Sequence, residues 1–281
     1  MTTTSTVRAA ALLGCALVLA ACAQEGADAG SPSSSSSSAP LPSGLVLQVA
    51  YTGGFTSPEE LATRLPLVTV HGDGRVLTQG PQIEIWPSPA LPNVQVQRVD
   101  EATVRDLVDR AVEAGVTEDG DLGEPPVADA PTTRFTLTTD EGTTVREVYA
   151  LAETPDDTLT AEQAEARARL RDLQDELTGL TAGAAEPYVP QTVAAVVAPH
   201  RGGDPELPQP DVAWPGPALP GTPIGPGISC VSATGQQAAD VLAAAASANA
   251  LTPWTTPDGA RWSVTFRPVL PHESGCADLG G

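Results

Sequence analysis

The chain has 281 residues and contains no lysine, and its 14 arginines face 35 acidic residues, which gives a formal charge of −21. Such a negative surface disfavours binding to nucleic acids and to anionic lipids. The absence of lysine also excludes Schiff-base chemistry, Walker-type phosphate binding and the Ser-x-x-Lys acyl-transfer pair.

The first 21 residues have the features of an export signal. A short polar region with Arg8 precedes an apolar run, Ala9–Ala21, which is shorter than the about 20 residues that a membrane-spanning helix needs. The run ends in Leu19-Ala20-Ala21-Cys22, which resembles the lipobox of bacterial lipoproteins. In that family the cysteine is diacylated and becomes the first residue after cleavage, so the resemblance implies lipidation of Cys22. The alternative is an ordinary secretory signal with an incidental cysteine.

Residues 22–42 are rich in serine, proline, alanine and glycine and have almost nothing to bury. We therefore expect a flexible tether between a lipid anchor and a folded body. Removing residues 1–21 removes Arg8 and no acidic residue, so the mature chain has 13 arginines against 35 acidic residues and a formal charge of −22. Signal, tether and composition together resemble the secreted lipoproteins of actinobacteria. This resemblance implies a location at the outer face of the cell membrane, and no reaction.

Residues 43–183 are expected to form a first α+β half. Turns at Asp73-Gly74 and at residues 140–142 predict two hairpins, because glycine readily adopts the positive φ of a tight turn. Strand patterns also occur at residues 45–51, 83–86 and 94–99. His71, beside the first turn, is interpreted as a surface residue.

Two helices are predicted in this half. The first starts after Asp100, carries an apolar stripe and ends at Gly115. The second starts with a capping box formed by Thr160 and Gln163. Its leucine stripe favours packing on its own sheet over pairing with a partner helix, because it is only a few turns long. The stripe consists of Leu170, Leu173, Leu177 and Leu180, with Arg167, Arg169 and Arg171 interleaved.

Residues 184–281 repeat the order of elements. A buried strand at 190–199, a short strand at 227–231, an alanine-rich helix and a hairpin at Asp258-Gly259 follow one another. The phrase WPSPALP at Trp86 recurs as WPGPALP at Trp214. We interpret the phrase as part of a duplicated unit and expect both tryptophans to be buried, each against the helix of its own half. Chance recurrence and a PxxP ligand motif are the alternatives. The predicted fold is α+β, with two similar halves that each pack a helix on a small, mostly antiparallel sheet.

The folded part contains two cysteines, Cys230 and Cys276. In an exported protein such a pair is most simply a disulfide. Metal ligation is the weaker alternative, since His272 is the only nearby histidine. The acidic stretch around Glu118 and Asp121 departs from the spacing of a calcium loop, so we expect no calcium site tighter than millimolar there.

No specific catalytic or nucleotide-binding motif occurs in the chain. We therefore predict no catalytic residues, no metal and no cofactor. The expected function is that of a non-catalytic, membrane-anchored extracytoplasmic protein that binds an envelope protein, a peptide or a wall ligand. The alternative is an exported hydrolase acting on a cell-envelope substrate. A pocket that joins a histidine, a buried acid and a hydroxyl favours the hydrolase, and an exposed apolar groove favours the binding protein.

Overall fold

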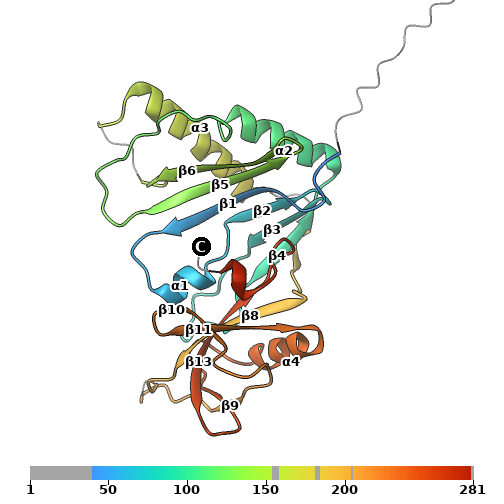
Figure 1. Ribbon diagram of the computed structural model, residues 1–281, viewed down its shortest axis with the longest axis vertical. Coiled ribbons are helices and arrows are strands. Elements are labelled where there is room, and N and C mark those ends of the chain that lie inside the picture. Colours follow the sequence, from blue (N-terminus) through green and yellow to red (C-terminus); the bar gives the residue numbers. More distant parts are fainter. Residues whose placement is uncertain (1–39, 154–157, 181–183, 204, 280–281) are drawn as a thin grey trace, which may run out of the picture. The chain divides into compact units, whose positions relative to one another are not determined.

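The computed structural model describes residues 40–153, 158–180, 184–203 and 205–279. Its fold is α+β, as predicted, and is built on two sheets (Figure 1). The strand order is β6-β5-β1-β2-β3-β4-β7 in the first sheet and β10-β11-β8-β13-β12-β9 in the second. The strand pairings are antiparallel except that of β9 with β12, which is parallel. Among the described residues, no helix is both long enough and apolar enough to cross a membrane.

The first sheet is made of neighbouring hairpins. The β2–β3 turn contains Gly74 at φ +81°, and a Cβ at this position would lie 2.2 Å from the backbone oxygen of Val99. Both predicted hairpins of this half, β2–β3 and β5–β6, are confirmed. The strands are β1 (Leu45–Gly53), β2 (Val68–His71), β3 (Arg75–Gln79), β4 (Val94–Arg98), β5 (Pro131–Thr139), β6 (Gly142–Tyr149) and β7 (Glu186–Pro187).

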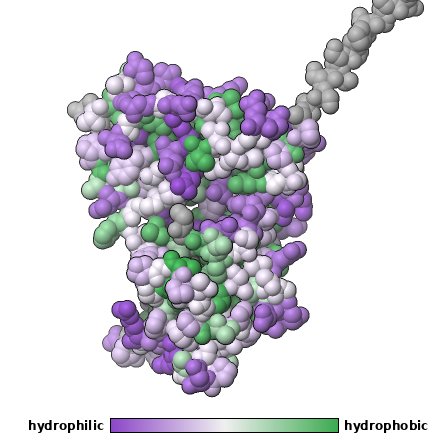
Figure 2. Space-filling model, viewed as in Figure 1, coloured by the Kyte–Doolittle hydropathy of each residue, from purple (hydrophilic) through white to green (hydrophobic). Residues whose placement is uncertain are grey.

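Two helices, α2 (Glu101–Glu113) and α3 (Ala161–Thr178), pack on this sheet, as Figure 1 shows. Asp100 caps α2, and Thr160 and Gln163 form the predicted capping box of α3. Leucines of the α3 stripe share one core with residues of β1, β2 and β5, so the interpretation that the stripe packs on its own sheet is confirmed. In Figure 2, which shows one face of the molecule, hydrophilic residues predominate over α2 and α3.

Arg167 of α3 has a buried side chain, although the residue is charged. Its guanidinium donates hydrogen bonds of 2.8 Å to the backbone oxygens of Tyr149 and Ala150, at the end of β6. The residue therefore connects the helix to the end of a strand, which an arginine in a charged stretch of the helix does not indicate from sequence alone.

The second sheet is buried on both faces. Alternate residues of β8 point to opposite sides: Val193, Ala195 and Val197 pack with α4, while Ala194 and Val196 pack against Ala62 of α1. This explains the nearly continuous apolar run of the central strand. The elements are β8 (Thr192–Pro199), β9 (Val212–Ala213), β10 (Thr222–Gly225), β11 (Ile228–Thr234), α4 (Gly235–Ala245), β12 (Trp254–Thr255), β13 (Arg261–Pro268) and the 3-10 turn η1 (Cys276–Asp278).

The two Trp-Pro phrases adopt different environments. Trp214 is buried, with 9% of its surface exposed, and packs in the α4 core as predicted. Trp86 is 69% exposed, so the prediction that it is buried is wrong. The phrases differ at Ser88 and Gly216. A Cβ at position 216 would lie 2.5 Å from the Trp214 ring and 2.9 Å from Val241, so serine does not allow the same packing.

The two sheets also differ in the order of their neighbours. The strand that precedes the helix of the predicted repeat is β4 in the first sheet and β11 in the second. β11 lies beside the central strand β8, which has β13 on its other side. β4 does not lie beside the central strand β1, which lies between β2 and β5. In addition, β7 follows the predicted boundary at residues 183 and 184 but pairs with β4 of the first sheet. The close similarity of the halves therefore stays a prediction.

Candidate functional site: a cavity between α1 and the β3–β4 connection

Helix α1 (Pro58–Thr63) carries one wall of a cavity. Ser57 caps the helix by accepting a hydrogen bond of 3.1 Å from the backbone N–H of Glu60, and Pro58 occupies the first turn, where its missing N–H costs nothing. The helix packs against β8 and β13 of the second sheet, and the Thr265 hydroxyl donates a hydrogen bond to the Glu59 carboxylate. One short helix from the first section of the chain is thus fixed on the second sheet.

The connection between β3 and β4, residues 80–93, forms the opposite wall. Ala90 N–H donates to the oxygen of Ala248 (3.2 Å), and Ala250 N–H donates to the oxygen of Ser88 (2.9 Å). Ala90 and Leu91 also pack on the core of the second sheet. The first Trp-Pro phrase therefore joins the two sheets.

The strand predicted at residues 83–86 is not formed. Pro81 and Pro87 flank these residues and have no N–H for a β-ladder. In addition, the N–H of Ile85 donates to the oxygen of Ile83 at 3.0 Å, which bends the backbone locally. The apolar residues of this stretch are consequently left outside both sheets.

The cavity between these walls has a volume of about 540 Å³, within the range of about 300–1,000 Å³ that small-ligand sites occupy. Its lining combines apolar groups with hydroxyl, amide and charged groups. The lining residues are 60 and 63–65 from α1 and its end, 79, 82, 83 and 88–92 from β3 and the connection, 250, and 264–266 from β13.

Three large apolar side chains are exposed on the cavity wall or next to it. Ile83, which lines the cavity, is 62% exposed, Ile85 is 56% exposed and Trp86 is 69% exposed. These three residues are called the apolar rim below. Clustered exposed apolar residues mark interaction sites on soluble proteins. Sequence reasoning missed the site because it assigned these residues to a strand. The two flanking prolines were the available signal.

Two of the three histidines lie together and do not line the cavity. His71 is 1% exposed, so its interpretation as a surface residue is wrong, and its ring centroid is 5.4 Å from that of His272. Burial, assisted by the nearby charges of His272 and Arg75, lowers the pKa of His71 to about 4. Burial also lowers the pKa of His272. Nε2 of His71 and Nδ1 of His272 are buried and have no hydrogen-bond partner among the described residues.

The third histidine, His200, contacts a serine. Its Nδ1 is 3.1 Å from the hydroxyl oxygen of Ser263, while its buried Nε2 has no hydrogen-bond partner in the described part of the chain. A nucleophilic serine needs a histidine that is itself oriented by a third group. Neither residue lines the cavity, which contains Glu60, Thr63, Ser88 and Thr265 as its acid and hydroxyl groups.

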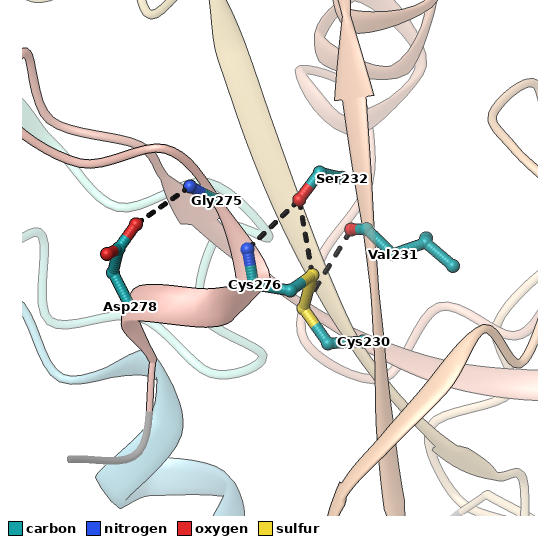
Figure 3. The surroundings of a disulfide bond; sticks show 6 residues. All are labelled: Cys230, Val231, Ser232, Gly275, Cys276 and Asp278. Atoms are coloured by element: carbon teal, nitrogen blue, oxygen red, sulfur yellow. Dashed lines mark hydrogen bonds between the residues drawn. A yellow bond between two sulfur atoms is a disulfide. The ribbon is translucent and has the colours of Figure 1, made fainter.

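The disulfide between Cys230 and Cys276 is confirmed (Figure 3). It fastens η1 to β11, across a separation of 46 residues in sequence. Ser232 supports the bridge, since its hydroxyl donates to the sulfur of Cys276 at 3.2 Å and accepts from the backbone N–H of Cys276 at 3.0 Å. Cys22, the predicted lipidation site, lies outside the described residues.

The acidic stretch around Glu118 and Asp121 makes contacts with other side chains. Arg169 lies 3.3 Å from the Glu118 carboxylate, and Asp121 accepts hydrogen bonds from Gly123 N–H and from the Gln163 amide, both at 2.9 Å. Within the described residues, no cluster of three or more histidine, cysteine or acidic side chains has the arrangement of a metal site. The absence of a tight calcium site stays a prediction.

Comparison of the chain with protein-family models, with curated proteins and with solved structures found no match.

Proposed function

We propose that the protein is a lipid-anchored extracytoplasmic protein whose folded body binds a partner, without catalysis, at the cavity between α1 and the β3–β4 connection. The observation that carries this proposal is the exposure of the apolar rim beside a cavity of about 540 Å³. Three large apolar side chains that stay in water contribute no hydrophobic free energy to the stability of the fold. A partner that covers them binds more tightly, because their burial removes apolar surface from water.

The residues that line the cavity also allow a choice between the two candidate functions, a hydrolase and a binding protein. A hydrolase site needs a nucleophile and a base within hydrogen-bond reach of a substrate. The described histidines do not line the cavity, and the His200–Ser263 pair lies outside its lining. The mixed polar and apolar lining, with an exposed apolar rim, supports the binding protein.

Site-specific photo-crosslinking tests this proposal. A photoreactive residue at Ile83 is expected to crosslink one partner in the native membrane, identified by mass spectrometry. The same residue at Val145 on β6, which is 52% exposed and does not line the cavity, is the matched control. Trp86→Ala should abolish the crosslink from position 83. Equal crosslinking from positions 83 and 145 would contradict the proposal.

The location of the protein is a proposal with a test of its own. Because Leu19-Ala20-Ala21-Cys22 resembles a lipobox, Cys22 is expected to carry a thioether-linked diacylglycerol. Cys22→Ser should abolish partitioning into a detergent phase. Cys15→Ser is the matched control, because residue 15 lies in the part of the signal that is removed. If the Cys22→Ser chain partitions like the wild type, the anchor is not at this cysteine.

A common origin of the two halves remains part of the proposal. The repeated order of strand, Trp-Pro phrase, strand, helix and hairpin supports it. The different neighbour orders in the two sheets require that the copies have since diverged in strand arrangement.

A further inference from the structure

We propose that the occupant of this cavity is a cationic peptide segment with apolar side chains, presented by another protein of the cell envelope. The inference deepens the proposed function and rests on it, because it specifies the chemistry of the partner at the same site. It follows from two features of the site, the apolar rim and the carboxylates that accompany it.

The apolar rim supplies the contact area. Aromatic residues combined with aliphatic neighbours form the centres of protein interfaces, where a few residues contribute most of the binding free energy. Trp86 is the most exposed of the four tryptophans of the chain, since Trp214 is 9% exposed, Trp254 is fully buried and Trp262 is partly buried. An apolar side chain of the partner is expected to contact Trp86 and Ile83 and to enter the cavity.

The carboxylates of Glu60 and Glu84 determine the charge of the partner. Glu84 lies between the two exposed isoleucines, and Glu60 lines the cavity. Neither forms an ion pair with a described residue, although the Glu60 carboxylate accepts a hydrogen bond from the Thr56 hydroxyl. Arg64, which follows α1 and also lines the cavity, donates to the backbone oxygen of Gly53 at 2.9 Å. Other arginines form ion pairs with acidic residues that do not line the cavity, as Arg110 and Arg134 do.

A partner with Arg or Lys side chains satisfies these carboxylates. Charge-assisted hydrogen bonds to a carboxylate are stronger than neutral ones and add geometric specificity. The formal charge of −22 on the mature chain steers cationic segments towards the protein and repels anionic ones. An alternation of cationic and apolar side chains in the partner therefore fits both features of the site.

Charge also argues against the other occupants. A second copy of this chain brings another 35 acidic residues to the interface, and repulsion between the copies opposes its docking. An anionic lipid surface repels the chain in the same way, and insertion of Ile83 and Ile85 would carry the Glu84 carboxylate into the membrane interface.

Fluorescence titration of the full chain with three short synthetic peptides tests the inference. One peptide alternates arginine with leucine, the second alternates glutamate with leucine and the third alternates arginine with serine. We expect the arginine–leucine peptide to bind at least about tenfold more tightly than either of the others. Binding should shift the tryptophan emission to shorter wavelength through the burial of Trp86, and Trp86→Phe should remove this shift.

Matched variants separate site-specific binding from general attraction to a negative surface. Glu84→Gln and Ile83→Ser should each weaken binding of the arginine–leucine peptide by about five- to tenfold. Glu141→Gln in the β5–β6 turn and Val145→Ser on β6 change an exposed acid and an exposed apolar residue away from the cavity, and should leave the affinity unchanged. Equal losses in both sets of variants would overturn the inference, since binding would then follow net charge alone.

The two experiments distinguish a wrong partner chemistry from a wrong binding site. If position 83 crosslinks a partner in the membrane but the glutamate–leucine peptide binds as tightly as the arginine–leucine peptide, the proposed function stands and the cationic partner is wrong. If Trp86→Phe leaves the emission shift in place and position 83 gives no crosslink, both are wrong.

Discussion

Trp214→Ala is expected to lower the free energy of unfolding by about 3–5 kcal/mol, the range for truncation of a large buried aromatic residue. The indole packs edge-on to Trp254, with ring centroids 5.7 Å apart, and is stacked with Phe266 at 6.3 Å. Its Nε1–H donates to the backbone oxygen of Pro217 at 2.6 Å. Alanine removes both ring contacts, leaves a cavity beside α4 and leaves this oxygen without its donor.

The first copy of the phrase provides the matched control. Trp86→Ala removes the same side chain from the same sequence context, but Trp86 is 69% exposed, so the free energy of unfolding should change by less than about 0.5 kcal/mol. Urea denaturation followed by far-ultraviolet circular dichroism measures both variants without relying on tryptophan emission. Equal destabilisation by the two substitutions would contradict the different packing of the two phrases.

Gly216→Ser tests the reason for this difference. It changes the second phrase into the sequence of the first, and the added Cβ would lie 2.5 Å from the Trp214 ring. Overpacking of this kind costs typically about 1–3 kcal/mol. A serine that is accepted at this position without loss of stability would mean that some other residue determines the burial of Trp214.

Elements with strong local signals were predictable from the sequence. The Asp100 cap of α2 and the capping box of α3 set the starts of those helices, and the Asp-Gly pairs at residues 73 and 258 set turns of two hairpins. These signals act through neighbouring residues and need no tertiary context. The disulfide was predicted from the small number of cysteines and from the resemblance of the first 21 residues to an export signal, and the pairing itself is confirmed.

Features that depend on distant contacts were not predictable. Helix α1 has its own start signal in Ser57-Pro58, but its position on the second sheet depends on Ala62 meeting β8. The short strand β7 exists only because β4 offers its free edge. The serine at position 88, where the second phrase has Gly216, becomes informative only once the close packing around Gly216 is known.

The candidate site was hidden for the same reason. Its walls come from residues 60–65, 79–92 and 264–266, which are far apart in the chain. Each wall considered separately has no distinctive sequence pattern. Tertiary contacts bring the walls together, among them the hydrogen bonds of Ser88 and Ala90 to the segment after α4 and that of Thr265 to Glu59. A binding cavity without a sequence motif is visible only in the folded chain.

Acid is expected to lower the free energy of unfolding through the contact between the first sheet and the segment that follows β13. This contact, which includes His71 and His272, is called the joint below. His71 ends β2, and His272 follows β13, so the two rings meet across this joint. The hydroxyl of Tyr188 donates to the backbone oxygen of Val269 at 2.9 Å, and Leu270 packs with Leu65, Leu77 and Val94 in the same region. Protonation of both histidines places two positive charges side by side in this buried position.

The other charged groups around the pair do not cancel this effect. Arg267 and Glu273 form a buried ion pair at 2.7 Å, with side chains 3% and 10% exposed, so the carboxylate is already neutralised by its partner. The remaining charged and titratable groups near the two rings are Asp73 and Arg75 of the β2–β3 hairpin, Asp278 of η1 and Tyr188. Burial outweighs the acidic neighbours, and the pKa values of both histidines are lowered.

The direction of the pH dependence follows from the lowered pKa. A buried histidine whose pKa falls from 6.5 to about 4 contributes stability that is fully present above pH 6.5 and is lost as the pH falls towards 4. For His71 alone, linkage converts this difference into about 3 kcal/mol, or about 2–3 kcal/mol after allowance for screening by nearby solvent. We therefore expect the free energy of unfolding to fall by at least this amount between pH 7 and pH 4.

Denaturation curves across this pH range, for the wild type and for three variants, measure the effect. His71→Phe and His272→Phe keep a ring in place and remove one titrating group each, so each should flatten the dependence between pH 7 and pH 4. His200→Phe replaces the histidine beside Ser263, away from the joint, and should retain it. Nuclear magnetic resonance of the His71 ring protons should give a midpoint near pH 4. A midpoint near 6.5, together with an unchanged pH dependence in His71→Phe, would show that the joint does not respond to acid through this residue.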